Sequence, residues 1–336
     1  MTKDVNKSNL PEGLEAVNES VFGFPTTQAL FFKKIATHDA IPPLEPAYVF
    51  VKQNLKILQL FMSGAEKNIL LTGDTGCGKT SLIEQVAARL NWPVFAIGCH
   101  GGLDFQELIG RVTLKPDGST GWADGPLISA MRVGGVFLLD EMNFLKPEVA
   151  GGLNTILQAS VYMIPETGEI IKAHRDFRIA ATGNAIDGVG KGAYRGTQTP
   201  NIALLNRFTL GIHMDYMSID NEAKMIQAKA SKIVDKVANF IAEIADMSRK
   251  NYRDGSLKSP ISPRETISLA KRLVEFSGGL VGVEALNAQM YGFMDSMEMT
   301  FLYRWQPEDK IAFMESTNSV AKRFGLSNLL NRDSLS

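Results

Sequence analysis

The stretch from Gly73 to Thr80 reads GDTGCGKT, and it limits what this chain can fold into more than any other segment. Its pattern, G-x-x-x-x-G-K-T, is that of a phosphate-binding loop, in which glycines let the backbone curl so that several N–H groups point at one anion. The segment before it, Asn68–Thr72, is short and apolar like a strand, and Ser81–Leu90 after it has apolar residues at helical spacing. Strand, loop and helix therefore follow in the order that the motif requires, which argues against a chance glycine turn.

Each residue type in this loop has a physical task in the binding of ATP and Mg²⁺. Lys79 can reach the β- and γ-phosphates, and Thr80 offers its hydroxyl to Mg²⁺. The helix that follows adds the positive end of its dipole. The residues predicted to bind the nucleotide are Gly73, Asp74, Thr75, Gly76, Cys77, Gly78, Lys79, Thr80 and Ser81.

An acidic pair closes the most strand-like segment of the chain. Asp140 and Glu141 follow the apolar run Val136–Leu139. A carboxylate at the end of a buried strand can hold the Mg²⁺ shell, and its neighbour can polarise water as a general base. We therefore predict Asp140 as a metal ligand together with Thr80, and Glu141 as the catalytic base.

Three further polar residues are predicted to take part in hydrolysis. Asn184 follows the strand-like segment Arg178–Thr182 and could orient the attacking water. Arg207 ends a short helix and could reach the γ-phosphate bound by a neighbouring subunit. Arg264, in the first turn of a later helix, could contact the nucleotide from a lid. The alternatives are a turn asparagine and two surface arginines.

Composition sets the broad class. The chain has 336 residues, 45% apolar and 21% charged, which is typical of a globular protein of about two domains. No apolar run approaches the ~18 residues of a membrane span, and the first residues lack the apolar core of a signal peptide. The two cysteines exclude a disulfide scaffold, so we expect a cytoplasmic protein without a membrane partner. The net charge of −1 gives no general attraction to nucleic acid.

Strands and helices alternate after the loop, which predicts an α/β fold with a parallel sheet flanked by helices and ligands at the carboxyl ends of the strands. We expect a leader and linker over residues 1–46, the α/β nucleotide-binding domain over 47–216 and a helical lid over 217–336. Helices are expected in the lid over Asn221–Met247, Ser262–Ser277 and Val283–Tyr303. The methionines of the last segment (Met290, Met294, Met297 and Met299) are expected to pack in the core.

The order of these motifs resembles that of an AAA+ ATPase. In the terms of that family, the loop is Walker A, Asp140-Glu141 is Walker B, Asn184 is sensor 1, Arg207 is the arginine finger and Arg264 is sensor 2. The resemblance implies an active oligomer, because the arginine finger acts on the nucleotide of the next subunit.

Two possible inserts are similar to those of the MoxR branch of AAA+ ATPases. Val161–Phe177 resembles the hairpin that this branch carries just before sensor 1. Val112–Trp122 fits the other insert of the branch, which lies in its second helix. The branch implies a homo-oligomer, a hexamer, and a separate partner that carries a von Willebrand A domain.

Within this branch the chain resembles the family of small ATPase subunits of aerobic cobaltochelatases. The likeness rests on Pro43–Tyr48, Ile83–Pro93 and Tyr194–Gln198. It implies ATP-driven remodelling of a protein partner or complex, as in a cobaltochelatase. The alternative function is a nucleic-acid-associated motor or restriction-type NTPase, which would need a basic groove or a recruitment domain.

Overall fold

The computed structural model describes residues 15–24, 29–32, 38–184 and 202–327, and the chain divides into two compact units. The first comprises Met1–Asp74 and Gly78–Met214, and the second comprises Thr75–Cys77 and Asp215–Ser336. Residues 194–198, on which part of the resemblance rests, lie outside the described residues. No helix in the described ranges combines the length and the apolar character that crossing a bilayer requires.

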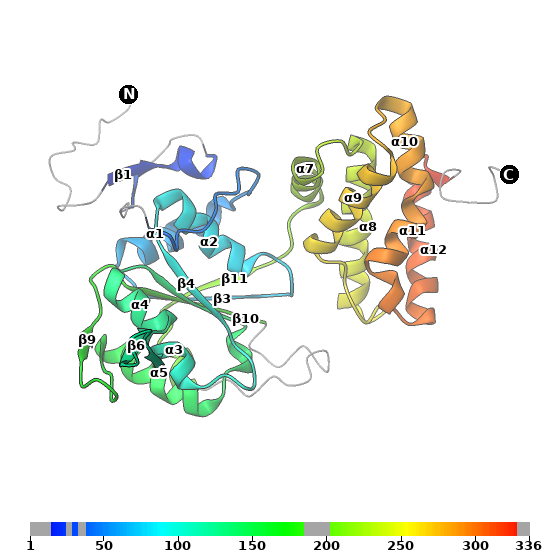
Figure 1. The fold of residues 1–336 in the computed structure, drawn as a ribbon. Coiled ribbons are helices and arrows are strands. Elements are labelled where there is room, and N and C mark those ends of the chain that lie inside the picture. Colours follow the sequence, from blue (N-terminus) through cyan, green and yellow to red (C-terminus); the bar gives the residue numbers. More distant parts are fainter. Residues whose placement is uncertain (1–14, 25–28, 33–37, 185–201, 328–336) are drawn as a thin grey trace, which may run out of the picture. The chain divides into compact units, whose positions relative to one another are not determined.

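A parallel five-stranded sheet forms the centre of the first unit, as predicted (Figure 1). Its strands lie in the order β11, β3, β10, β7, β4. Their bounds are β3 Asn68–Gly73, β4 Val94–Gly98, β7 Val136–Asp140, β10 Arg178–Gly183 and β11 Leu210–Met214. Because β3, β10 and β7 are neighbours, the segments that follow them meet at one edge of the sheet.

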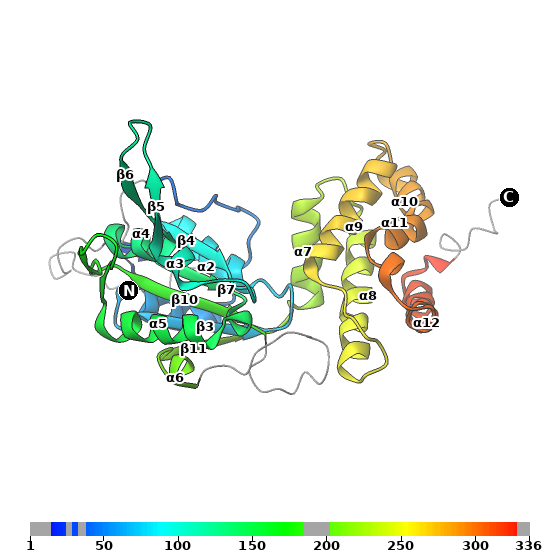
Figure 2. The ribbon, with the colours of Figure 1, turned by 60° about the horizontal axis from the view of Figure 1, so that its bottom comes forward.

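Helices cover both faces of this sheet, which is why β7 reads as an unbroken apolar run (Figure 2). Val136 and Leu138 pack on one side with residues of α1 and α2, and Phe137 and Leu139 pack on the other side with residues of α3, α4 and α5. This alternation is the period of two that a strand imposes on its side chains. The helices are α1 Leu55–Ser63, α2 Lys79–Leu90, α3 Phe105–Ile109, α4 Pro126–Val133, α5 Pro147–Ala159 and α6 Ile202–Leu205.

Three antiparallel hairpins are attached to the first unit. β1 (Glu15–Asn18) pairs with β2 (Ala29–Phe32) near the start of the chain. The two expected inserts are confirmed as β5 (Gly110–Leu114) with β6 (Thr120–Asp124), and β8 (Val161–Met163) with β9 (Ile170–Lys172).

Arg132, in the last turn of α4, joins the β5–β6 and β8–β9 hairpins. Its Nε donates to Asp124 Oδ2 at the end of β6 over 2.7 Å, and its Nη1 and Nη2 donate to the two carboxylate oxygens of Glu169 over 2.5 and 2.6 Å. Glu169 directly precedes β9. A bidentate arginine–carboxylate pair is more directional than a single ion pair, so the two hairpins are tied through one guanidinium.

The second unit is all helical, as predicted, but its helices are shorter than the apolar pattern indicates. The segment expected as one helix over Asn221–Met247 forms two, α7 and α8, because residues 230–234 leave the helix. Here Gln289, a fully buried residue, accepts a hydrogen bond from the Val234 N–H and donates one to the Lys232 carbonyl. The bounds are α7 Ile219–Lys229, α8 Asp235–Arg253, α9 Pro263–Phe276, α10 Gly282–Tyr291, α11 Phe293–Thr300 and α12 Pro307–Phe324.

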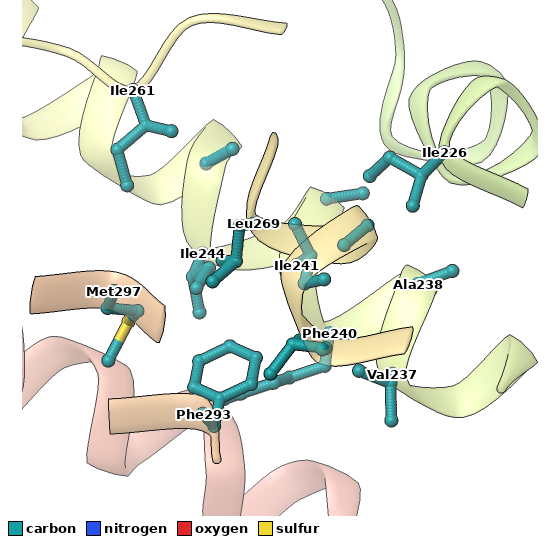
Figure 3. Packing of buried hydrophobic residues seen from close by; sticks show 14 of the residues in the cluster. Ile226, Val237, Ala238, Phe240, Ile241, Ile244, Ile261, Leu269, Phe293 and Met297 are labelled. Atoms are coloured by element: carbon teal, nitrogen blue, oxygen red, sulfur yellow. The ribbon is translucent and has the colours of Figure 1, made fainter. Parts of the chain in front are cut away.

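Aromatic and aliphatic side chains from α8, α9 and α11 fill the core of this unit (Figure 3). Phe240 and Phe293 lie with ring centroids 5.1 Å apart. Met290 and Met297 are buried as expected and Met294 is partly buried, but Met299 is 53% exposed and its predicted core position is wrong. Met299 lies two positions after Met297 on α11, which places it on the opposite side of this helix from the buried Met297. The single helix expected over Val283–Tyr303 is also interrupted, at Gly292.

A buried ion pair crosses the second unit. The Arg249 guanidinium donates to both carboxylate oxygens of Glu222 over 2.5 and 2.8 Å, with side chains only 2% and 1% exposed. Its Nε donates to the Ile261 carbonyl over 2.8 Å, and Thr266 Oγ1 donates to Glu222 Oε1 over 3.0 Å. The pair therefore connects α7 and α8 to the segment from which α9 starts.

Candidate active site

The loop between β3 and α2 has the backbone that its glycines permit. Gly73, Gly76 and Gly78 have φ angles of 144°, 80° and 94°, which L side chains rarely adopt. Gly78 is the N-cap of α2 and provides no side-chain cap. The positive end of a 12-residue helix is therefore left for an anion rather than for a capping side chain.

Lys79 reaches back over this loop from the first position of α2. Its Nζ donates to the carbonyls of Gly73 and Asp74, both over 2.9 Å, and to Asn184 Oδ1 over 3.3 Å. The structure thus brings together two predicted site residues, Lys79 at the start of α2 and Asn184 just after β10. The Asn184 N–H also donates to Asn143 Oδ1 over 3.4 Å.

Thr80 and Asp140, the two predicted metal ligands, are in direct contact. Thr80 Oγ1 donates to Asp140 Oδ1 over 2.7 Å. A hydroxyl and a carboxylate oxygen are the donors that Mg²⁺ takes in nucleotide sites, and here they lie beside the loop that would hold the phosphates. The donor set therefore fits Mg²⁺ bound with a nucleoside triphosphate.

Glu141 has an unusual backbone for a glutamate. Its φ and ψ are 57° and 45°, in the left-handed region, which is about 1–2 kcal/mol less favourable for an L residue. Its N–H donates to Thr182 Oγ1 over 3.0 Å, and the residue is exposed at the carboxyl edge of the sheet. A strained residue persists only where its surroundings determine it, and such residues concentrate at functional sites.

Negative charge gathers at this edge and changes the titration of its neighbours. Burial, and next the charge of Asp140, raise the pKa of the Glu84 carboxyl on α2. Burial and the charges of Asp140 and Glu141 raise the pKa of the Cys99 thiol to about 12. A divalent cation bound by Asp140 would offset this concentration of negative charge.

Thr182 is a site residue that our sequence analysis did not identify. It is fully buried on β10, and its Oγ1 donates to Asp140 Oδ1 over 2.5 Å while it accepts the Glu141 N–H. One signal could have identified it: Thr182 is the polar residue in the apolar strand Ile-Ala-Ala-Thr, two positions before Asn184.

Arg207 and Arg264 are not brought to the loop by the contacts within the described residues. Arg207 Nη2 donates to Gln158 Oε1 on α5 over 3.0 Å, and its Nε is buried without a hydrogen-bond partner among the described residues. Arg264 is exposed in the first turn of α9 in the second unit, after the Ser262–Glu265 capping box. Their roles at the nucleotide stay predictions.

Comparison with known proteins identifies an AAA domain in the first unit of this chain. Residues 68–208 match the AAA domain of the dynein-related subfamily. The aerobic cobaltochelatase subunit CobS of a Sinorhizobium species is 31% identical over 281 residues, which cover 80% of this chain and 82% of CobS. A protein of unassigned function from Staphylococcus haemolyticus is 36% identical over 193 residues, which cover 55% and 70% of the two chains. Among solved structures, the RuvB Holliday junction branch migration motor of Thermotoga maritima aligns at 15% identity and a TM-score of 0.47, over 87% of this chain and 91% of that chain.

Proposed function

Because this chain belongs to the AAA+ ATPases and is related to the cobaltochelatase subunit CobS, we propose that it is a ring-forming, Mg²⁺-dependent ATPase of the MoxR type that remodels a protein partner or complex. The observation that carries the proposal is the hydrogen-bonded group at the carboxyl edge of the sheet. Lys79 is joined there to Asn184, and Thr80 is joined to Asp140. These are the side chains that phosphate binding, metal binding and water positioning need.

Each side chain has a distinct part in the proposed hydrolysis. Thr80 and Asp140 would hold Mg²⁺, which neutralises charge on the β- and γ-phosphates when it is bound. Lys79 would exchange its carbonyl acceptors for phosphate oxygens. Asn184 would orient the attacking water, and Glu141 would accept its proton as general base.

The proposed active state is an oligomer, a hexamer by analogy with the family. Arg207 makes its side-chain hydrogen bond to Gln158 and not to the phosphate-binding loop of the same chain. Its Nε is buried without a hydrogen-bond partner among the described residues. This supports a role toward the nucleotide of the next subunit, where a guanidinium stabilises the charge that develops on the γ-phosphate.

The partner that we propose is a separate protein with a von Willebrand A domain, in a complex organised like a cobaltochelatase. The hairpins support a protein contact because they present apolar side chains to solvent: Leu114 at the end of β5 is 80% exposed and Met163 at the end of β8 is 56% exposed. Hydrolysis would move these hairpins against the partner.

Assembly and turnover can be tested together. Light scattering with and without Mg·ATP should show assembly, and phosphate release should show hydrolysis. The Glu141→Gln variant should bind ATP and stay assembled with hydrolysis reduced roughly 10²- to 10⁴-fold, the usual effect of losing a general base. A wild-type protein that stays monomeric under saturating Mg·ATP and never hydrolyses it would refute the proposal.

The action of Arg207 on a neighbour has its own test. Arg207→Ala and Lys79→Ala should each abolish turnover, and mixing the two should restore part of it, because some interfaces then combine an intact loop with an intact arginine. Arg175→Ala, at an arginine whose side chain is 70% exposed, is the matched control and should be active. Mixtures that stay inactive would argue against action between subunits.

A filter-binding series over salt concentration tests the nucleic-acid alternative. Tight binding of DNA that falls steeply with salt would favour the motor over the proposed remodelling of a protein.

A further inference from the structure

The hydroxyl of Thr182 connects the two acidic residues of the site. It donates to Asp140 Oδ1 over 2.5 Å and accepts the Glu141 N–H over 3.0 Å, so its one donor and one of its lone pairs are both used. The sheet register explains the placement, because Ala181 of β10 pairs with Leu139 of β7 and Thr182 is the next residue along. The side chain is fully buried, so water does not compete for these hydrogen bonds.

The consequence for Asp140 concerns the orientation of its carboxylate. Oδ1 accepts from Thr80 as well as from Thr182. The Thr80 hydroxyl is also the group that the loop motif assigns to Mg²⁺. Once Thr80 turns to a cation, Thr182 is the remaining hydroxyl that holds the carboxylate.

The consequence for Glu141 concerns its backbone. The residue has φ 57° and ψ 45°, and its N–H is fixed by Thr182. The direction of the Glu141 side chain follows from this backbone conformation. One hydroxyl thus sets both the rotation of the metal-ligand carboxylate and the starting direction of the base.

We propose that Thr182 is a positioning residue that keeps Asp140 and Glu141 in a fixed relative geometry for hydrolysis, without touching the nucleotide itself. The inference rests on the proposed ATPase function. A buried threonine that only filled space would be replaceable by valine, which has the same shape, whereas a positioning hydroxyl would not be.

The test compares Thr182→Val with Thr182→Ser, which retains the hydroxyl. Thr182→Val should lower kcat about 10- to 100-fold, the scale of a sub-ångström misplacement of catalytic groups, with the Kd for ATP changed less than threefold. Thr182→Ser should restore kcat to within about threefold of wild type. The control is Thr209→Val, which removes an exposed hydroxyl that donates to Glu66 Oε2, and it should keep wild-type turnover.

A second readout needs no nucleotide. The Glu141 amide should exchange with deuterium at least tenfold faster in Thr182→Val than in wild type or in Thr182→Ser, as measured by NMR. A Thr182→Val protein with kcat within twofold of wild type and unchanged exchange of this amide would overturn the inference. If Thr182→Val does not fold, Thr182→Ala takes its place under the same criteria. Wild-type protein that fails to hydrolyse ATP in the same assay would instead count against the proposed function.

Discussion

Removing the charge of Glu222 should destabilise the second unit far more than removing the charge of a glutamate whose partner is open to solvent. In wild type, Arg249 is 2% exposed and its guanidinium donates to both Glu222 oxygens. Glu222→Gln replaces one acceptor oxygen with an NH₂ group that faces another donor and leaves a buried charge uncompensated. Breaking a buried pair in this way costs about 3–5 kcal/mol.

The matched control is Glu243→Gln in the same unit. Glu243 pairs with Arg323 over 2.7 Å, with side chains 23% and 62% exposed, so water reaches this pair, and pairs open to solvent contribute about 0–1 kcal/mol. Hydrogen exchange read by mass spectrometry over α7, α8 and α9 reports this unit separately. A loss of 3–5 kcal/mol corresponds to exchange about 10²- to 4 × 10³-fold faster for amides that exchange through unfolding of the unit.

Equal exchange in Glu222→Gln and Glu243→Gln would refute this reasoning. A double variant with methionine at positions 222 and 249 provides a second check, because an apolar pair of similar volume is often as stable as the ion pair it replaces. We expect its exchange to lie closer to that of wild type than the exchange of Glu222→Gln does.

Three further outcomes are expected. Lys79→Ala should weaken ATP binding at least tenfold in calorimetry, because the loop loses its only lysine; affinity within twofold of wild type would contradict the assigned contact with the phosphates. Arg132→Gln should make residues 161–172 more sensitive to limited proteolysis, while Arg111→Gln, at an exposed arginine on β5, should not. Cys99, with a pKa raised to about 12 chiefly by burial, should resist iodoacetamide at pH 8 because the thiolate is the reactive form; rapid labelling of Cys99 in the folded protein, located by peptide mapping, would exclude this account. Stability should also fall between about pH 9 and 12, because in that range the unfolded chain loses the Cys99 proton while the folded protein keeps it.

The features that the sequence predicts are those determined by neighbouring residues. The phosphate-binding loop, the strand before Asp140 and the two inserted hairpins all follow from patterns over a few positions. Thr182 could not be identified in the same way because its partners lie 41 and 42 residues away. The break between α7 and α8 has a similar cause, since the side chain that hydrogen-bonds the Val234 N–H and the Lys232 carbonyl outside the helices is that of Gln289, 55 residues after Val234.

The last helix, α12, shows a different reason why an element can escape prediction from the sequence. α12 was not among the helices predicted, and its buried residues are Phe313, Thr317, Val320 and Ala321. They fall on one face of a helix, but one is polar and one is small, so the apolar stripe is weak in the sequence. Burial of this face depends on α8, against which α12 packs.

The bridge from Arg132 to Asp124 and Glu169 limits how this molecule can change in evolution or be redesigned. Each hairpin supplies a carboxylate to the same guanidinium, so a chimera that borrows one hairpin without its carboxylate would leave Arg132 with one partner in place of two and would untie the hairpins from each other. The two inserts should therefore be inherited as a matched set with their arginine. Exchanging both hairpins together is expected to preserve this bridge, whereas exchanging one is expected to break it.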